Sequence, residues 1–418
     1  MSTIHIIGAG LAGLACAVRL TAAGKTVAVH EAAPNAGGRC RSFYDQTLDR
    51  RIDNGNHLLL SANRSALAYL AEIGASETLI TPERAEFPFV DLDSGQRWLV
   101  RPNRGPLPWW LLNRSRRVPD TRLGDYASGL KLLTAPKSAT VADCVAPDHP
   151  LYRRFWEPLT LAVMNVAPDQ AAVAPLRLVL LETFARGAEW CRPLIARDGL
   201  ADSLVEPALA WLRARGVEPG FGRRLRILGF EGGRVASLDF TGQNVMLEAG
   251  DAVVLAVPPA TAATLVPGLT VPEGETPIVN AHFRLPRPAP LPFGQPFIGV
   301  VGGAAHWVFV RGDIASVTVS GATDLVDLAA EEITARLWRD VARALELDPG
   351  EAPPPCRIVK EKRATFLQTP ANLDRRPPAR TAWPNLMLAG DWTATGLPAT
   401  IESAVRSGQT AATALLRL

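Results

Sequence analysis

A glycine-rich turn near the start of the chain has the spacing of a site that binds a dinucleotide. The apolar run at residues 4–7 predicts a buried strand, and the apolar spacing of residues 11–23 predicts a helix directly after the turn. A helix N-terminus presents free N–H groups and the positive end of its dipole, which attract phosphate. We therefore predict a pyrophosphate site at this turn. Its residues are Gly8, Gly10, Leu11, Ala12 and Gly13.

An acidic residue ends the next predicted strand. Residues 25–30 predict this strand, and Glu31 follows it, 23 positions after Gly8. A carboxylate in this position accepts hydrogen bonds from ribose hydroxyls and repels a 2′-phosphate. Glu31 therefore favours FAD or NAD over NADP.

A second glycine pair is followed by an arginine. The N–H groups of Gly37 and Gly38 and the guanidinium of Arg39 are suited to hold a pyrophosphate from the other side. A nicotinamide dehydrogenase would instead continue with alternating strands and helices. A surface loop with an incidental basic pair is the alternative.

The C-terminal residues predict another strand and helix of the same site. Residues 385–389 predict a buried strand, Gly390 and Asp391 follow it, and residues 401–416 predict an amphipathic helix. The N-terminus of this helix would stabilise negative charge on a reduced flavin ring, and Asp391 would accept a hydrogen bond from a ribityl hydroxyl or a phosphate-bound water. An ordinary strand and helix closing the sheet is the alternative.

Length and composition limit the remaining classes. The 418 residues suit two or three domains, and 47% hydrophobic residues exclude a disordered chain. The net charge of +3 does not predict nucleic-acid binding, and the start lacks the basic and apolar regions of a secretory signal. We therefore expect a cytoplasmic protein. The cysteines lack CxxC spacing, which predicts neither disulfides nor a metal site; they are Cys16, Cys40, Cys144, Cys191 and Cys356.

The two glycine motifs, Glu31 and the terminal sequence 388–391 together resemble the flavin amine oxidase and phytoene desaturase superfamily. The resemblance implies non-covalently bound FAD and an α/β fold, in which a Rossmann-like FAD-binding domain is interleaved with an α+β substrate domain. The implied FAD-binding segments are 1–80, 196–274 and 376–418. The implied substrate-binding segments are 81–195 and 275–375.

A narrower resemblance is to the squalene-associated FAD-dependent desaturases. This chain departs from their pattern at two positions, with Asn56 where a glutamine is common and Ser403 where a glycine is common. The motifs that carry it are 53–60, 156–159, Asn165, 306–309 with 311–312, 362–366 and 396–408. It implies a flavoenzyme that acts on a lipophilic C30 isoprenoid, reducing hydroxysqualene to squalene by hydride transfer from reduced flavin with loss of water. It also implies further FAD-binding residues, which are Asn54, Gly55, Val257, Ala399, Thr400 and Ile401.

The proton donor for the leaving hydroxyl is not ranked by the sequence. His57, Asp53 and Glu402 are candidates because they lie in motifs expected near the flavin ring. Each also has a structural alternative: His57 would orient a turn, Asp53 would hold the loop at Gly38 and Arg39, and Glu402 would strengthen a helix start.

Only one complete nucleotide motif is present, which predicts an external electron donor.

Two other functions remain open from the sequence. An oxidative phytoene-type desaturase or amine oxidase would run the flavin in the opposite direction, and a lipid carrier would lack catalysis. All four tyrosines lie in the N-terminal half, which weakens the amine oxidase interpretation; they are Tyr44, Tyr69, Tyr126 and Tyr152.

The middle of the chain predicts the walls of a hydrocarbon site. Its helices are expected at 151–163, 175–188 and 325–347, and its strands at 276–285, 297–301, 307–311 and 314–320. A hairpin is expected from 225–228 and 235–240, and a buried strand at 252–257, which belong by resemblance to the FAD domain. Ordinary core packing would give the same pattern.

A basic segment with two tryptophans stands apart. Residues 101–119 contain five arginines and no acidic residue, together with Trp109 and Trp110. Aromatic rings beside cations are typical of contact with lipid headgroups. We therefore expect a peripheral contact of these tryptophans with the inner face of the cell membrane. A partly buried loop with a solvated basic rim is the alternative.

Overall fold

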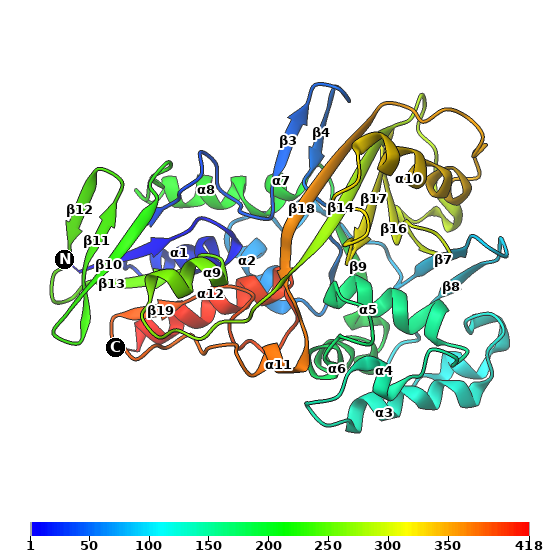
Figure 1. Ribbon diagram of the computed structural model, residues 1–418, viewed down its shortest axis with the longest axis horizontal. Coiled ribbons are helices and arrows are strands. Elements are labelled where there is room, and N and C mark those ends of the chain that lie inside the picture. The colour runs from blue at the N-terminus through cyan, green and yellow to red at the C-terminus, as the bar shows by residue number, and fades with distance from the viewer. Residues whose placement is uncertain (1, 418) are drawn as a thin grey trace.

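A four-stranded parallel sheet joins three distant parts of the chain in the computed structural model, which describes residues 2–417 (Figure 1). Ile6 pairs with Val254, and Val254 pairs with Met387 on its other side. The four strands predicted here are confirmed within two residues at each end. They are, in the order of the sheet, β19 (Leu386–Leu388), β13 (Ala252–Leu255), β1 (Thr3–Ile7) and β2 (Thr26–His30).

Helices α1 (Leu11–Ala22) and α12 (Ile401–Leu416) pack against each other beside this sheet, as Figure 1 shows. Both helices are confirmed where the apolar spacing predicts them. A Cβ added at Gly408 of α12 would lie 2.1 Å from the carbonyl oxygen of Ala12 in α1. The two helices therefore approach closely because residue 408 has no side chain. The same core includes residues of α2 (Arg64–Glu72), α7 (Leu200–Leu204) and α8 (Glu206–Arg213).

The predicted hairpin is the start of a three-stranded antiparallel sheet. Its third strand, β12, is mostly exposed and lacks the apolar alternation that reveals a strand in a sequence. The strands are β10 (Leu225–Glu231), β11 (Arg234–Phe240) and β12 (Gln243–Met246), and α9 (Pro259–Leu265) packs beside them.

A seven-stranded sheet forms the other half of the molecule. The four strands predicted between residues 276 and 320 are confirmed in it. Its order is β18 (Cys356–Phe366), β14 (Glu275–Arg284), β17 (Ile314–Ser320), β16 (Trp307–Arg311), β15 (Phe297–Val301), β7 (Phe87–Asp91) and β8 (Arg97–Val100).

One face of this sheet packs on α10 (Ala330–Ala344). The helix predicted at 325–347 is therefore too long at both ends. Residues 322–328 form turns instead, and Ala329 has an extended backbone. Glu346 then adopts a left-handed backbone with φ of 61°, which ends the helix.

Helices cover the other face of the sheet (Figure 1). The helix predicted at 151–163 is a π-helical turn (Tyr152–Trp156) followed by α5 (Glu157–Met164). The helix predicted at 175–188 is α6 (Val173–Glu182), which ends because Thr183 is non-helical with ψ of −93°. Two shorter helices complete this layer, α3 (Ser128–Thr134) and α4 (Val141–Cys144).

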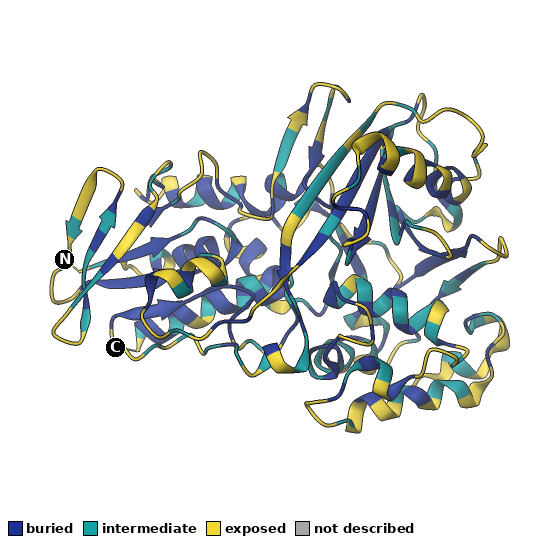
Figure 2. Ribbon diagram, viewed as in Figure 1, coloured by how far each residue is buried: buried dark blue, intermediate teal, exposed yellow. Residues whose placement is uncertain are grey.

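The remaining elements are short. The described residues contain no helix that is both long and apolar enough to cross a membrane. Figure 2 shows that the buried residues concentrate on the sheets and on the inner sides of the helices. The mixed α/β class is confirmed, and the domain boundaries stay a prediction. The short elements are β3 (Ser42–Asp45), β4 (Arg50–Asp53), β5 (Leu59–Leu60), β6 (Leu79–Ile80), β9 (Pro193–Ala196), α11 (Pro370–Leu373) and the 3₁₀ turns 76–78, 109–112, 114–116, 123–127, 184–186, 188–190 and 292–294.

Candidate active site

The glycines of the first turn have different surroundings. A Cβ added at Gly8 would lie 2.3 Å from the carbonyl oxygen of Ala256, and one at Gly13 would lie 1.8 Å from that of Gly8. At Gly10 a Cβ would meet nothing within 4 Å. Gly8 and Gly13 therefore allow the backbone to pack, whereas Gly10 borders open space. The N-terminus of α1 at Leu11 and Ala12 has no side-chain cap and no acidic residue in its first turn.

Glu31 is held beside this turn by backbone hydrogen bonds. The N–H of Ala9 donates to its carboxylate at 2.7 Å, and the N–H of Ala33 donates at 2.8 Å. The carboxylate of Glu31 is therefore fixed at the end of β2, next to the glycine turn.

Arg39 connects the second glycine pair to the C-terminal part of the site. The N–H of Gly37 donates to the carbonyl of Ala9 at 2.8 Å, which places the pair beside the first turn. At Gly38 φ is 58°, and a Cβ there would lie 3.4 Å from Gly10. Arg39 pairs with Asp391 at 2.7 Å and donates to the carbonyl of Ala364 at 2.6 Å.

The two charges of this pair differ in exposure. The side chain of Asp391 is 6% exposed, whereas that of Arg39 is 46% exposed. The charge of Asp391 raises the pKa of Arg39 above its usual value. One oxygen of Asp391 is therefore already bound to Arg39, and the predicted contact of Asp391 with a ribityl hydroxyl or water stays a prediction.

The Arg39 loop is held by Asn54 and not by Asp53. The Asn54 amide donates to the carbonyl of Arg39 at 2.9 Å and accepts from the N–H of Arg41 at 3.0 Å. The structural alternative considered for Asp53 is therefore wrong. A neutral side chain is needed here, because the same residue must both donate and accept.

Asp53 instead connects three elements. Its carboxylate accepts from the Ser42 hydroxyl at 2.5 Å, from the Leu200 N–H at 2.9 Å and from Arg311 at 3.1 Å. It is buried, with 6% of its surface exposed. All three partners donate to it, so the carboxylate serves as an acceptor between β3, α7 and β16.

A polar network extends from this loop across the seven-stranded sheet. Asn280 on β14 donates to the carbonyl of Asn54 at 3.1 Å and accepts from Thr318 on β17 at 2.8 Å. The amide of Asn56 donates to the Thr318 hydroxyl at 3.0 Å. Gly55 lies against this network, since a Cβ there would be 3.2 Å from Asn280.

Among residues 2–417, His57 has one weak polar contact, between Nδ1 and the carbonyl of Gly55 at 3.4 Å. It is of intermediate exposure, and burial lowers its pKa below 6.5. Leu58 next to it belongs to the apolar cluster that contains Trp307 and Phe309. His57 therefore lies in the chain between Asn56 of the polar network and Leu58 of the apolar cluster.

Glu402 caps a helix, but not its own. Its carboxylate accepts from the N–H groups of Ser65 at 3.1 Å and Ala66 at 2.9 Å, at the start of α2. Arg406, one turn later in α12, donates to it at 3.0 Å. Glu402 therefore supports the start of α2, not of its own helix, and holds α2 against α12.

The start of α12 is built by residues of the predicted motif together with Gln368, which the sequence motifs did not indicate. Thr400 caps the helix by accepting from the Ser403 N–H at 3.2 Å, and Ile401 begins it. Gln368 accepts from the N–H of Ala399 at 2.9 Å. These contacts fix the loop through which Ala399, Thr400 and Ile401 are expected to meet the flavin.

Arg376 holds the loop that precedes this helix, and the sequence analysis missed it. Its guanidinium, in a residue 7% exposed, donates to the carbonyls of Asp391, Thr393 and Leu397 at 2.9, 2.9 and 2.7 Å. A lone arginine in a loop carries no spacing signal, so only the tertiary structure shows this role.

Val257 and Gly390 meet at the ends of β13 and β19. The indole N–H of Trp392 donates to the carbonyl of Val257 at 2.9 Å. At Gly390 φ is 150°, and a Cβ there would lie 2.3 Å from the Trp392 ring. Glycine at position 390 therefore allows the tryptophan to lock the two strand ends together.

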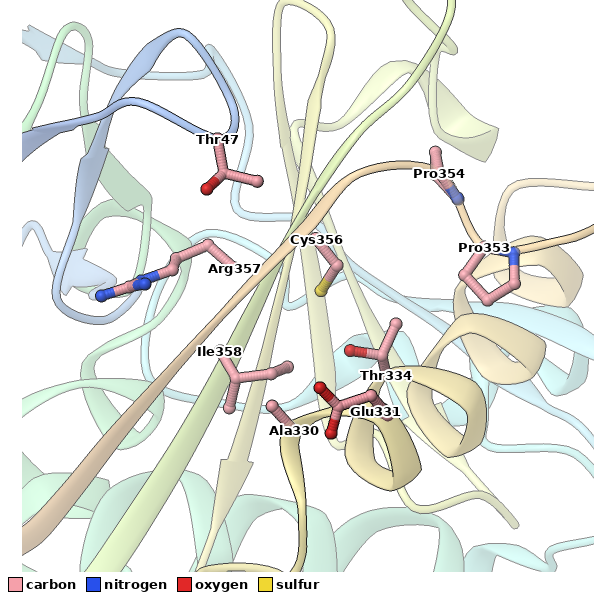
Figure 3. A pocket seen from close by; sticks show the side chains of 9 residues that line it. All are labelled: Thr47, Ala330, Glu331, Thr334, Pro353, Pro354, Cys356, Arg357 and Ile358. Atoms are coloured by element: carbon pink, nitrogen blue, oxygen red, sulfur yellow. The ribbon is translucent and has the colours of Figure 1, made fainter.

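A pocket of about 460 Å³ lies elsewhere, between α10, β18 and the loop at Thr47 (Figure 3). Cys356 and Ile358 line it and belong to the core on the α10 face, whereas Asn280 lies on the opposite face of the sheet. Burial raises the pKa of the Cys356 thiol to about 11, so this cysteine is not a reactive thiolate. The pocket contains none of the predicted site residues.

The N- and C-terminal motifs therefore converge on one cradle. Its free helix N-terminus, the open space at Gly10 and the half-exposed cation of Arg39 fit a dinucleotide, whose phosphates need N–H donors and positive charge.

Comparisons with known proteins agree with this geometry. The family described as flavin containing amine oxidoreductase matches residues 11–416. Among solved structures, cyclohexylamine oxidase from Brevibacterium oxydans has a TM-score of 0.71 at 16% identity, covering 100% of this chain and 99% of its own. Putrescine oxidase bound to putrescine has a TM-score of 0.68 at 18% identity, with coverage of 100% and 99%.

Fold and site together define a flavin-dependent oxidoreductase. The chain belongs to the flavin-containing amine oxidoreductase family. Its relatives include proteins named hydroxysqualene dehydroxylase. That of Rhodopseudomonas palustris is 48% identical over 415 residues, which are 99% of this chain and 98% of the relative. Those of Zymomonas mobilis and Sinorhizobium fredii are 45% and 46% identical, covering 99% and 98% of this chain and 98% and 97% of their own lengths.

Proposed function

We propose that this chain binds FAD without a covalent link and reduces hydroxysqualene to squalene. The observation that carries the proposal is the match to three proteins named hydroxysqualene dehydroxylase, each aligned over at least 97% of its own length. No specific observation favours the oxidative alternatives, a phytoene-type desaturase or an amine oxidase.

The proposed FAD site uses the cradle described above. The start of α1, Gly10 and Arg39 would hold the pyrophosphate, Glu31 would accept from the adenosine ribose, and the start of α12 would face the flavin ring. Non-covalent binding is supported by the sequence after residue 356, which contains no cysteine, histidine or tyrosine that could link to the ring. The full set of proposed FAD-binding residues is Gly8, Gly10, Leu11, Ala12, Gly13, Glu31, Gly37, Gly38, Arg39, Asn54, Gly55, Val257, Gly390, Asp391, Ala399, Thr400 and Ile401.

Bound reduced FAD would supply the hydride that replaces the substrate hydroxyl, which leaves as water after taking up a proton. The protein must therefore exclude water from the hydrocarbon and deliver that proton. Leu58, Trp307 and Phe309 contribute to an apolar wall suited to an isoprenoid chain. Asn56 and His57 add polar groups at its edge.

His57 is the candidate, of the three, whose ring the contacts leave most available. Because burial lowers its pKa, the ring is mostly neutral near pH 7 and must take up a proton before it donates one to the leaving hydroxyl. Both oxygens of Asp53 and both oxygens of Glu402 accept hydrogen bonds within the protein. The His57 ring has a single long contact and stays available to a substrate. A His57→Gln variant should bind FAD normally but lose most of its turnover, about 10²-fold or more. A variant with full turnover would exclude His57.

A contact of Trp109 with the inner face of the cell membrane is part of the proposal.

An external electron donor is part of the proposal too. Only the Gly8 motif provides a complete nucleotide turn. A further glycine pair, Gly220 and Gly222, lacks the third glycine of such a motif, and Gly220 forms a β-bridge to His30 at the edge of the parallel sheet. The reduced flavin would therefore receive its electrons from a separate reductase or carrier.

The function can be tested by anaerobic reduction of the purified, FAD-loaded protein followed by mixing with hydroxysqualene. We expect the flavin absorbance to return while one squalene forms for each flavin oxidised. A polyene or an amine is mixed with the oxidised protein as the alternative test. If either compound reduces the flavin, and oxygen is consumed on turnover, the protein is instead a desaturase or an amine oxidase.

A further inference from the structure

Half of the large apolar side chains that are exposed among the described residues come from one short stretch of the chain. Among the described residues, twelve large hydrophobic side chains are exposed, and six of them lie between residues 107 and 133. We call these six residues the docking face. They are Leu107 (57% exposed), Trp109 (62%), Leu112 (61%), Leu123 (45%), Leu130 (63%) and Leu133 (40%).

Internal contacts hold the docking face together. Trp110 is less exposed than Trp109, because its ring packs edge-on against Tyr126 at 5.8 Å, and its expected contact with lipid stays a prediction. This ring pair connects the turn at 109–112 to the turn at 123–127, which continues into α3. Tyr126 also accepts from the N–H of Val118 at 2.8 Å. The apolar side chains therefore stand on a defined platform and not on a loose loop.

The charge of the chain is concentrated on the same platform. Residues 101–137 contain eight arginines and lysines and two acidic residues, a net charge of +6. The whole chain has a net charge of +3, so the rest of it is net negative by three. Within the described residues, six of these eight cations have no carboxylate within 4 Å. They are Arg114, Arg116, Arg117, Arg122, Lys131 and Lys137.

An arginine-lined pocket lies next to the apolar side chains. Its volume is about 310 Å³, and five guanidinium groups line it with two carboxylates. Asn103, which also lines the pocket, donates to the carbonyl of Leu107 at 2.8 Å and accepts from the N–H of Trp110 at 3.1 Å. The Nε of Arg192 is buried there without a hydrogen-bond partner. The five arginines are Arg84, Arg101, Arg104, Arg116 and Arg192.

We propose that this surface docks the enzyme on a bilayer that contains anionic phospholipid. The docking face would enter the headgroup region, the unpaired cations would meet negative lipids, and the arginine pocket would take a lipid phosphate. The apolar cluster that contains Trp110 also contains Leu58, next to His57. Docking would therefore bring a lipophilic substrate to the surface above the apolar cluster that also contains Leu58, and this last step alone rests on the proposed substrate.

The experiment uses FAD-loaded, full-length protein and vesicles without substrate. Flotation with vesicles of phosphatidylcholine and phosphatidylglycerol is compared with flotation on phosphatidylcholine alone. We expect binding only to the anionic vesicles, and loss of binding at high salt, because exposed charges are screened. Binding that ignores vesicle charge and salt would overturn the proposal.

Two double variants, each compared with a matched control double variant, locate the contact. The double variant Trp109→Ser with Leu130→Ser should weaken vesicle binding about tenfold or more, because it removes two apolar side chains that would move from water into the bilayer. The matched control is Ile227→Ser with Met246→Ser, whose residues are 58% and 67% exposed on β10 and β12. Arg114→Gln with Lys131→Gln should weaken binding about 25-fold, since each cation near an anionic surface contributes about 1 kcal/mol. Its control is Arg224→Gln with Arg226→Gln.

Other outcomes separate this proposal from its competitors. Equal binding of the docking-face and control variants would overturn it. A dimer that Trp109→Ser with Leu130→Ser converts to monomer would show that a second copy covers the face, which also overturns it. Flavin content and thermal unfolding report folding of each variant. Turnover of detergent-solubilised hydroxysqualene should be unchanged in all four double variants, so failure of docking and failure of the proposed function are distinguishable.

Discussion

Arg39 and Asp391 meet at 2.7 Å across 352 positions of the chain. This ion pair connects the loop after the second glycine pair to the end of β19, so the two halves of the proposed FAD site depend on each other. Asp391 is buried and Arg39 is half exposed, which leaves part of the guanidinium free for a phosphate.

Removing this arginine tests the cradle directly. Arg39→Ala should weaken FAD binding roughly 10- to 100-fold, because hydrogen bonds to charged groups contribute about 1.5–3 kcal/mol. Arg41→Ala is the matched control, since Arg41 is exposed and pairs only loosely with Glu361 at 3.5 Å. Titration of the apoproteins with FAD, followed by flavin fluorescence, measures both affinities. Equal losses of FAD affinity in the two variants would show that Arg39 does not hold the cofactor.

The glycines of the first turn should separate folding from cofactor binding. Gly13→Ala forces a Cβ against the Gly8 carbonyl and should lower the free energy of unfolding by about 2 kcal/mol or more. Gly10→Ala places its Cβ in open space, so the apoprotein should unfold as the parent does while FAD affinity falls. Thermal unfolding with and without FAD measures both effects. A Gly10→Ala apoprotein as unstable as the Gly13→Ala apoprotein would contradict the assignment.

Glu402 should act on stability. Glu402→Ala removes the acceptor of two α2 N–H groups and leaves Arg406 without this partner, so we expect a loss of about 3 kcal/mol in the free energy of unfolding. Glu402→Gln keeps an acceptor oxygen and should lose about 1 kcal/mol. Denaturant unfolding gives the free energies. Turnover per bound flavin should stay near that of the parent, and a hundredfold loss in Glu402→Gln would instead support a role in proton transfer.

Buried histidines should make the fold sensitive to acid. Burial lowers the pKa of His30 to about 3 and of His282 and His306 to about 4, and lowers those of His5 and His57 as well. Below pH 6.5 the unfolded chain therefore binds protons that the folded chain does not, so the free energy of unfolding should fall from pH 6.5 towards 4. Each such histidine contributes up to about 1.4 kcal/mol per pH unit. Denaturant unfolding at several pH values measures this slope, and His306→Gln should reduce it; a flat or inverted profile would contradict the burial of these rings.

The elements around the flavin site could be predicted because their signals are local. Residues 4–31 contain strand, turn, helix and acid in one continuous stretch, and the strands at 276–320 have clear apolar runs. Polar residues within an apolar strand carry no such signal of their own, so Asn280 and Thr318 were missed. Their contacts with Asn54 and Asn56 join segments far apart in the sequence, so only the tertiary structure shows them.

Tertiary contacts decided the remaining differences. Asp53 and Asn54 are adjacent in the sequence, yet only the structure shows that the neutral residue holds the Arg39 loop. Trp109 and Trp110 look equivalent in the sequence, and the position of Tyr126 partly covers Trp110 while Trp109 stays exposed. The helix predicted at 325–347 has helical apolar spacing at both ends, but turns and a left-handed Glu346 limit it to Ala330–Ala344.

The central claim, reduction of an allylic alcohol by hydride from bound flavin, is tested most directly by a single turnover in D₂O. The hydrogen at flavin N5 exchanges with solvent, so the prereduced, FAD-loaded protein should convert hydroxysqualene into squalene that contains one deuterium on carbon. Squalene without deuterium, or reduced flavin that persists beside unchanged hydroxysqualene, would contradict the account.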